Sequence, residues 1–195
     1  GLYLLSYMKH IQTCDYTIYT NLPLDNSGQN SELVKLKILK KTHPKVIVLN
    51  GSNLNFIGMK LSEIGFMDED LYIEILSNIA KEYPLATVNY YTHRGESETK
   101  LSKLANKGFT IHLNNLPMEE YFLIHGAPKG AYYTFYSTAL YNVSNMLDGC
   151  DFYALEPDSS FWPEDDAESI ELCYELFRRS DIKIKKVNFK INHNA

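Results

Sequence analysis

Residues 92–96 bring together a hydroxyl, an imidazole, a guanidinium, a glycine and a carboxylate. The five residues before them, Thr-Val-Asn-Tyr-Tyr, are β-branched or aromatic at most positions and predict a buried strand. Ligands of open α/β sheets bind beyond the carboxyl ends of the strands. His93 and Arg94 would therefore offer several N–H donors to a phosphate at such an edge. The alternative is a solvated loop that happens to contain both residues.

Ser137 and Thr138 form a second candidate site, because they open a helix expected to run to about Met146. The free N–H groups and the dipole of a helix N-terminus favour negative charge, and two hydroxyls add two donors. Simple N-capping also explains a Ser or Thr at this position. With the His93 loop expected on the same sheet edge, phosphate binding is the favoured interpretation.

Two weaker candidates complete the set. Gly51, Ser52 and Asn53 follow an apolar run and predict a tight polar turn on the same edge, where a nucleotide could contact Gly51 and Asn53. The turn is too short for a P-loop, and the sequence has no GxGxxG fingerprint. Glu119 and Glu120 lie in the first turn of another predicted helix, where they either stabilise the dipole or accept ribose hydroxyls.

The order of expected elements defines the fold class. Strands are predicted at 45–50, 85–91, 109–113, 131–136, 151–155 and 182–191, and helices at 68–83, 98–107, 116–124, 137–146 and 164–179. This alternation predicts an α/β protein with a Rossmann-like, mostly parallel sheet flanked by helices. Residues 44–195 would form this domain. Residues 1–43 are interpreted as a linker or a remnant of an N-terminal domain.

Composition narrows the function classes. The chain has 195 residues, 45% hydrophobic and 22% charged, with a net charge of −5 that argues against general nucleic-acid binding. Three widely spaced cysteines suggest a reducing compartment and no metal site. No apolar run is long enough for a transmembrane helix. The chain begins at Gly1 without a Met, which predicts a fragment with residues missing upstream.

Three segments in this order resemble the C-terminal half of bacterial GT-B sialyltransferases. They are Tyr-Tyr-Thr-His-Arg-Gly-Glu at 90–96, the pair Glu119-Glu120, and Tyr-Thr-Phe-Tyr-Ser-Thr-Ala-Leu-Tyr-Asn at 133–142. The resemblance covers about residues 45–160 and is closest to lipooligosaccharide sialyltransferases and capsular polysialyltransferases. In these families a His-Pro motif contacts the phosphate of CMP-sialic acid, a Glu holds the ribose, and a Ser-Ser or Ser-Thr pair binds the phosphate.

The resemblance implies a role for each matching residue. His93, Ser137 and Thr138 would contact the phosphate, Glu120 the ribose, and Gly51–Asn53 the cytosine. Arg94 stands where the motif has Pro and would add charge against the phosphate or mark a different donor. The family's acidic general base has no clear counterpart, and the family needs a second Rossmann-like domain for the acceptor.

The expected activity is therefore metal-independent, inverting transfer of sialic acid from CMP-sialic acid to a glycan acceptor of cell-surface lipooligosaccharide or capsule. No cofactor is expected beyond this donor substrate. The missing acceptor domain would be an N-terminal domain or a partner chain. The expected location is the cytoplasm, including the inner face of the cytoplasmic membrane. An oligomeric state is compatible with the sequence. Two alternatives remain: a non-catalytic Rossmann-like partner or regulatory domain, and a GT-B transferase using another nucleotide sugar.

Overall fold

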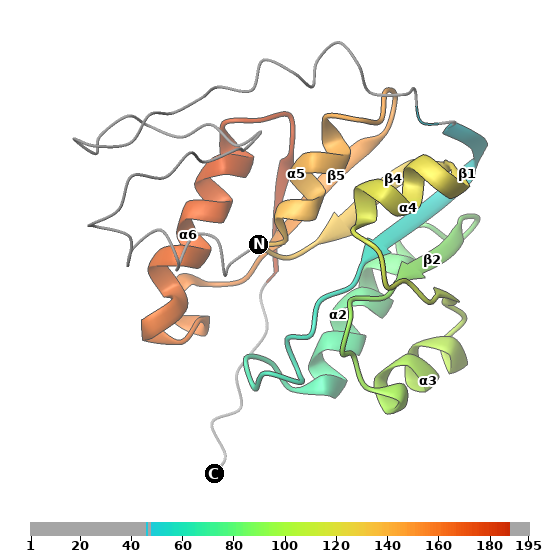
Figure 1. Cartoon of the computed structure of the whole chain (residues 1–195). Helices are drawn as coiled ribbons and strands as arrows, with labels where there is room; N and C mark the ends of the chain where they lie inside the picture. Colours follow the sequence, from blue (N-terminus) through green and yellow to red (C-terminus); the bar gives the residue numbers. More distant parts are fainter. Residues whose placement is uncertain (1–45, 47, 188–195) are drawn as a thin grey trace. The chain divides into compact units, whose positions relative to one another are not determined.

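The computed structural model describes Val46 and residues 48–187 (Figure 1). The chain divides into two compact units, Gly1–Lys45 and Val46–Ala195, and all described residues belong to the second unit. The linker or remnant predicted at 1–43 lies outside the described residues, as does the end of the strand predicted at 182–191.

Six parallel strands form one sheet in the order β3-β2-β1-β4-β5-β6. The strands are β1 (Val48–Ile57), β2 (Thr87–Tyr91), β3 (Thr110–His112), β4 (Ala127–Thr134), β5 (Asp151–Glu156) and β6 (Lys183–Lys186). The chain leaves β1 on one side to build β2 and β3, and then crosses to the other side of β1 to build β4, β5 and β6. This order reverses direction between β1 and β4, as in doubly wound dinucleotide-binding folds. The predicted α/β class is confirmed.

Helices cover both faces of the sheet (Figure 1). They are α2 (Glu69–Lys81), α3 (Glu98–Asn106), α4 (Met118–His125), α5 (Thr138–Ser144) and α6 (Glu164–Arg178), with a short 3₁₀ turn η1 at Ser159–Phe161. Side-chain caps begin several of them. Asp68 accepts hydrogen bonds from the Asp70 and Leu71 amides of α2, and Ser97 accepts one from the Lys100 amide of α3. Helix α3 ends before Gly108, whose φ of +90° suits the left-handed end of a helix.

Alternate residues of the central strands fill two cores. On the α2 side, Phe56 packs against Tyr133, which lies 5.7 Å away between ring centres. On the α4 side, Phe122 of α4 contacts both Tyr91 and Tyr132 in edge-to-face geometry. The strict alternation follows from the two-residue period of a strand. A sheet buried on both faces needs such side chains on both sides, which explains the apolar runs in the sequence.

The turn predicted at Gly51–Asn53 is wrong, because these residues lie inside β1. The pairing of β1 with β4 shifts between Leu49, opposite Pro128, and Asn53, opposite Gly130. Two extra residues are thus accommodated as a bulge within the strand. The turn-forming residues in this stretch indicated a chain reversal, but the strand continues to Ile57.

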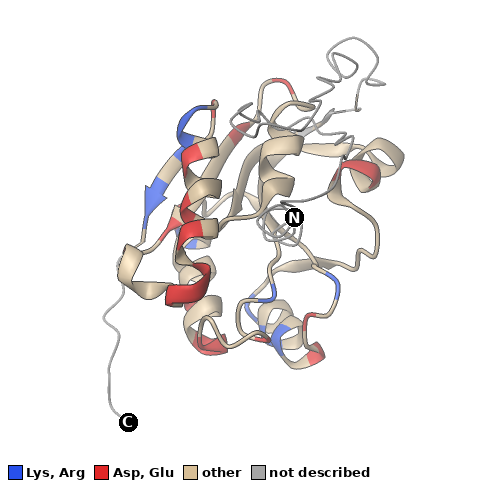
Figure 2. Cartoon of the chain, turned by 60° about the vertical axis from the view of Figure 1, so that its left-hand side comes forward, with Lys and Arg blue, Asp and Glu red and all other residues tan. Residues whose placement is uncertain are grey.

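Charged residues are unevenly distributed over the outer elements (Figure 2). Acidic side chains begin and line α6, and lysines lie on β6. The buried carboxylate of Glu156, at the end of β5, joins these elements through ion pairs with Arg178 and with Lys186, the latter at 2.5 Å. These pairs connect α6 and β6 at the edge of the sheet that lies farthest from β3.

Candidate functional site

The two strongest sequence candidates lie at one edge of the sheet. Strand β2 ends at Tyr91, two residues before His93, and β4 ends at Thr134, three residues before Ser137. Both strands are hydrogen-bonded neighbours of β1 and run parallel to it. The loops after β2 and β4 therefore flank the carboxyl end of β1, at the point where the strand order reverses. Ligand sites of open α/β sheets lie at this point.

His93 and Arg94 are both exposed. The His93 Nδ1 atom lies 2.7 Å from the Arg94 carbonyl oxygen, so this nitrogen carries the proton that is donated. The other ring nitrogen, Nε2, then donates to an anion only in the imidazolium form. The Arg94 guanidinium offers its N–H donors without this requirement.

Ser137 and Thr138 are half-buried where β4 leads into α5. The Ser137 hydroxyl oxygen accepts a hydrogen bond from the Ala139 amide at 3.3 Å, which is an N-cap. The same hydroxyl still has its own proton to donate. Capping and anion binding are therefore compatible at Ser137, although α5 has only seven residues.

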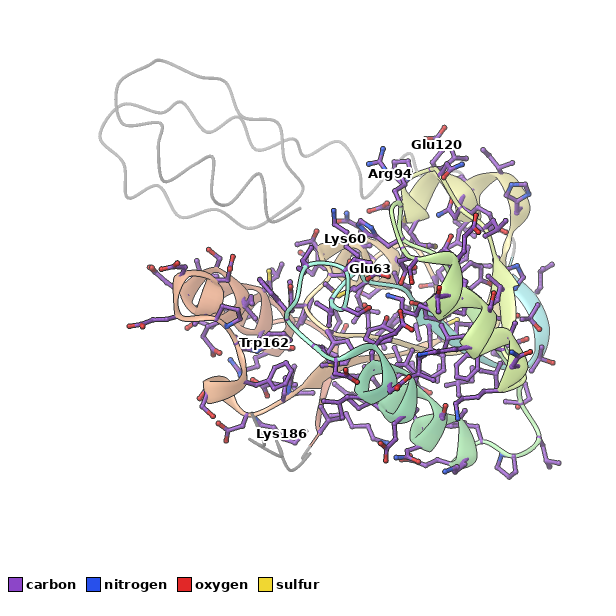
Figure 3. All side chains as sticks on the ribbon, turned by 90° about the horizontal axis from the view of Figure 1, so that it is seen from below. Lys60, Glu63, Arg94, Glu120, Trp162 and Lys186 are labelled. Carbon is purple, nitrogen blue, oxygen red and sulfur yellow. The ribbon has the colours of Figure 1, made fainter. Side chains whose placement is uncertain are left out.

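The paired glutamates at the start of α4 have different surroundings. Glu119 accepts a hydrogen bond from the Asn142 side chain and so links α4 to α5. Glu120 is exposed. It lies near Arg94 in the view of Figure 3, in agreement with the chain order, because α4 begins at the edge where β2 and β3 end.

Gly51 and Asn53 do not join this group. Asn53 pairs with Thr87, the first residue of β2, and its side-chain amide donates to the Lys129 carbonyl oxygen at 3.1 Å. Asn53 lies four residues before Ile57, a distance of about 13 Å at the rise of a β-strand. The prediction that the 51–53 segment stands at the carboxyl edge to meet a cytosine is therefore wrong.

A buried lysine lies beneath the His93 loop. The Lys100 side chain is fully buried, and its ammonium lies 2.7 Å from Glu96 Oε1 and 3.0 Å from Glu63 Oε2. It also donates to the Met59 carbonyl oxygen at 3.0 Å and lies over the Tyr72 ring. Sequence reasoning missed Lys100. Its one signal was the i, i+4 spacing from Glu96, which is also common on exposed helix faces.

Tyrosine hydroxyls complete this cluster. Tyr90 donates to Glu96 Oε1 at 2.5 Å, and the Tyr72 and Tyr90 hydroxyls lie 3.0 Å apart. Burial raises the pKa of Glu96, although the nearby Lys100 ammonium opposes that shift. Burial also raises the pKa of Tyr90 well above its ordinary value. Burial acts on Glu63 in the same direction, but hydrogen bonds from the Ser97 amide and Lys100 outweigh it, and the pKa of Glu63 is lowered.

A row of polar side chains crosses the α4 face of the sheet. His112 Nε2 lies 2.9 Å from Asn89 Oδ1, Asn89 donates to Asn55 at 3.0 Å, and Asn55 donates to the Ala131 carbonyl oxygen at 3.4 Å. Burial lowers the pKa of His112. The sequence interpretation of His112 as a strand residue is confirmed.

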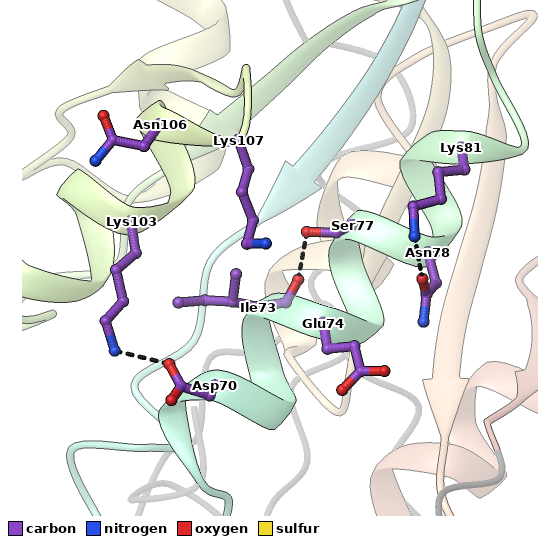
Figure 4. Close-up of a pocket in the computed structure, with 9 residues that line it drawn as sticks. All are labelled: Asp70, Ile73, Glu74, Ser77, Asn78, Lys81, Lys103, Asn106 and Lys107. Carbon is purple, nitrogen blue, oxygen red and sulfur yellow. Dashed lines mark hydrogen bonds and ion pairs between the residues drawn. The ribbon is translucent and has the colours of Figure 1, made fainter.

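A shallow groove of about 570 Å³ lies between α2 and α3 (Figure 4). Lys81, Lys103 and Lys107 line it together with Asp70 and Glu74, and Lys103 is paired with Asp70 at 2.7 Å. No residue of the predicted site lines this groove. Its mixed charges indicate a solvated junction between two helices.

Among Val46 and residues 48–187, no group of three or more His, Cys, Asp or Glu side chains could hold a metal ion. Within the same part of the chain, no helix is both long and apolar enough to cross a membrane. Comparison with protein-family models gives no match, and comparison with curated proteins gives no significant match.

Proposed function

We propose that residues 46–187 form the donor-binding half of a glycosyltransferase that uses CMP-sialic acid. The observation that carries the proposal is the position of two loops, one with His93 and Arg94 and the other with Ser137 and Thr138. Both flank the carboxyl end of β1 where the strand order reverses. Imidazolium, guanidinium and hydroxyl donors at one edge match the oxygen atoms of a nucleotide phosphate.

Each residue has a stated role in this proposal. His93, Arg94, Ser137 and Thr138 bind the phosphate and stabilise the negative charge that develops on the departing CMP. The exposed carboxylate of Glu120, at the first turn of α4, accepts hydrogen bonds from ribose hydroxyls. A base outside this half removes the proton of the acceptor hydroxyl, which attacks the anomeric carbon with inversion.

Calorimetry of the full chain with CMP tests the proposal. His93→Ala and Ser137→Ala should each lower the affinity roughly tenfold or more, because a hydrogen bond to a charged group contributes about 1.5–3 kcal/mol. His125→Ala and Ser144→Ala are matched controls, since these residues lie at the far ends of α4 and α5. The proposal is refuted if the wild-type chain binds no CMP, or if the His93→Ala/Ser137→Ala double variant binds CMP with wild-type affinity. UDP and GDP as competitors test for another nucleotide sugar.

One observation favours a second candidate, a non-catalytic partner domain. Helix α4 and the loop before it expose apolar side chains, with Leu113 77% exposed and Ile124 60% exposed. Large exposed apolar side chains gathered in one region mark interaction surfaces. Sedimentation of the wild type and of Ile124→Lys tests this candidate. Self-association that the substitution abolishes, in a chain that binds no nucleotide, would favour the partner domain.

A further inference from the structure

The exposed tip and the buried base of the His93 loop differ in environment. His93, Arg94 and Gly95 are exposed, and the backbone of Gly95 has a φ of +83°, which residues other than glycine rarely adopt. The base of the loop is formed by Glu96, whose side chain is only 1% exposed. The conformation of the tip therefore depends on how firmly Glu96 is held.

Both oxygens of Glu96 are occupied. Oε1 accepts from Tyr90 and from the Lys100 ammonium, whereas Oε2 accepts from the His93 amide at 2.7 Å. Two of these three donors come from β2 and α3, and the third is the backbone of the exposed tip. The carboxylate thus links the His93 backbone directly to buried parts of the fold.

Lys100 extends the same linkage to the loop after β1. Its ammonium also contacts the Met59 carbonyl oxygen and Glu63, whose other oxygen accepts from the Ser97 amide at 2.9 Å. The space is closely filled, because a Cβ atom added at Gly58 would lie 2.7 Å from Glu96 Oε2. One buried charge therefore holds two loops at the carboxyl edge in a fixed arrangement.

A buried ion cluster is a poor source of stability, because removing the charges from water costs about as much free energy as their attraction returns. Two carboxylates facing one ammonium make this cluster less favourable still. Apolar side chains of similar volume would fill the space at lower cost. The cluster of Lys100, Glu96 and Glu63 is better suited to holding the two loops in one conformation.

We propose that Lys100 and Glu96 are positioning residues that hold the His93 amide and thereby direct His93 and Arg94 toward the ligand edge. The identity of the ligand as a nucleotide phosphate rests on the proposed function. The positioning itself does not, because it can be measured on the unliganded chain. A cluster with a purely structural role would contribute to the free energy of unfolding only. A variant as stable as the wild type would then keep the wild-type conformation of the His93 loop.

The test separates stability from positioning with the double variant Lys100→Met/Glu96→Met. Two methionines fill the space of the buried pair, and the Glu63 side chain, which is 17% exposed, keeps the Ser97 amide as a donor, so the thermal unfolding midpoint should stay close to that of the wild type. The acceptor of the His93 amide is lost, so hydrogen exchange at this amide should accelerate at least tenfold, while exchange in β4 stays unchanged. CMP affinity should fall at least tenfold. Lys103→Met, on the same helix but outside the cluster, is the matched control and should change neither quantity.

Wild-type exchange at His93 and wild-type CMP affinity in the double variant would overturn the proposal. If the wild type binds no CMP, the proposed function fails, and the exchange measurement still decides the positioning. If the double variant does not fold, Tyr90→Phe decides, because it removes only the hydroxyl that donates to Glu96. A twofold or larger acceleration of exchange at His93 supports the proposal, and unchanged exchange overturns it.

Discussion

At the scale of single residues, two histidines in the described part of the chain occupy different environments. His93 is exposed on a loop, whereas His112 is half-buried and donates to Asn89. Its ring also stacks on Tyr91, 4.6 Å away between ring centres. Types and spacing alone do not separate a ligand-facing imidazole from one that belongs to a hydrogen-bonded row.

The environment of His112 predicts a pH-dependent stability. Burial lowers the pKa of the His112 ring in the folded state. The stability that the neutral ring contributes is therefore fully present above the ordinary pKa of 6.5, and it is lost as the pH falls through the lowered pKa. His112→Gln keeps an N–H donor for Asn89 without a titrating group. The free energy of unfolding should therefore fall more steeply between pH 7 and pH 5 in the wild type than in the variant. Denaturant melts at each pH measure it, and parallel curves would contradict the assignment.

At the scale of elements, strand β1 depends on a close approach between two backbones. A Cβ atom placed on Gly130 would lie only 1.9 Å from the Asn53 carbonyl oxygen. No side chain fits there while β1 keeps its bulge. The glycine in β4 is thus required by the irregularity in its neighbour.

Gly130→Ala should therefore destabilise the chain by about 1–3 kcal/mol or more, because backbone atoms cannot move aside as a flexible side chain does. Gly108→Ala is the control, since the Gly108 Cβ would meet nothing within 4 Å and the substitution tests only the strain of a positive φ. That strain should cost about 1 kcal/mol. Urea denaturation of both variants measures the difference. A smaller loss for Gly130→Ala than for Gly108→Ala would show that the bulge is not rigid.

At the scale of the whole molecule, the net charge of −5 opposes the binding of a nucleotide anion. Arg94, exposed at the edge of the sheet, supplies local positive charge against this field. Salt screens both effects, and the nearer charge dominates at close range.

Affinity for CMP should therefore decrease as NaCl is raised from 50 to 500 mM in the wild type. In Arg94→Gln the affinity should be lower at all salt concentrations, and its decrease with salt should be smaller or reversed. Calorimetry at three salt concentrations measures this, with Lys107→Gln, in the groove between α2 and α3, as the control. Equal salt dependence in Arg94→Gln and the wild type would exclude a contact between Arg94 and the phosphate.

Local sequence signals are sufficient to predict most of the helices and strands, and the edge of the sheet on which His93 and Ser137 lie. Helices such as α2 and α6 follow from local signals, namely acidic starts and apolar side chains at three- and four-residue steps. The alternation of strands and helices implied a parallel sheet, and a parallel sheet places the ends of all its strands at one edge. This rule predicts that the loops containing His93 and Ser137 lie at the same edge of the sheet.

The strand irregularity and the buried charges that support that edge arise only in the folded chain. The bulge at Gly51–Asn53 exists because Gly130, distant in the chain, lets two backbones approach closely. Lys100 is buried because Glu63 and Tyr72, both distant from it in the sequence, pack around the pair that it forms with the nearby Glu96. Local sequence carries no record of such contacts, since their free energy depends on neighbours that only the folded chain brings together.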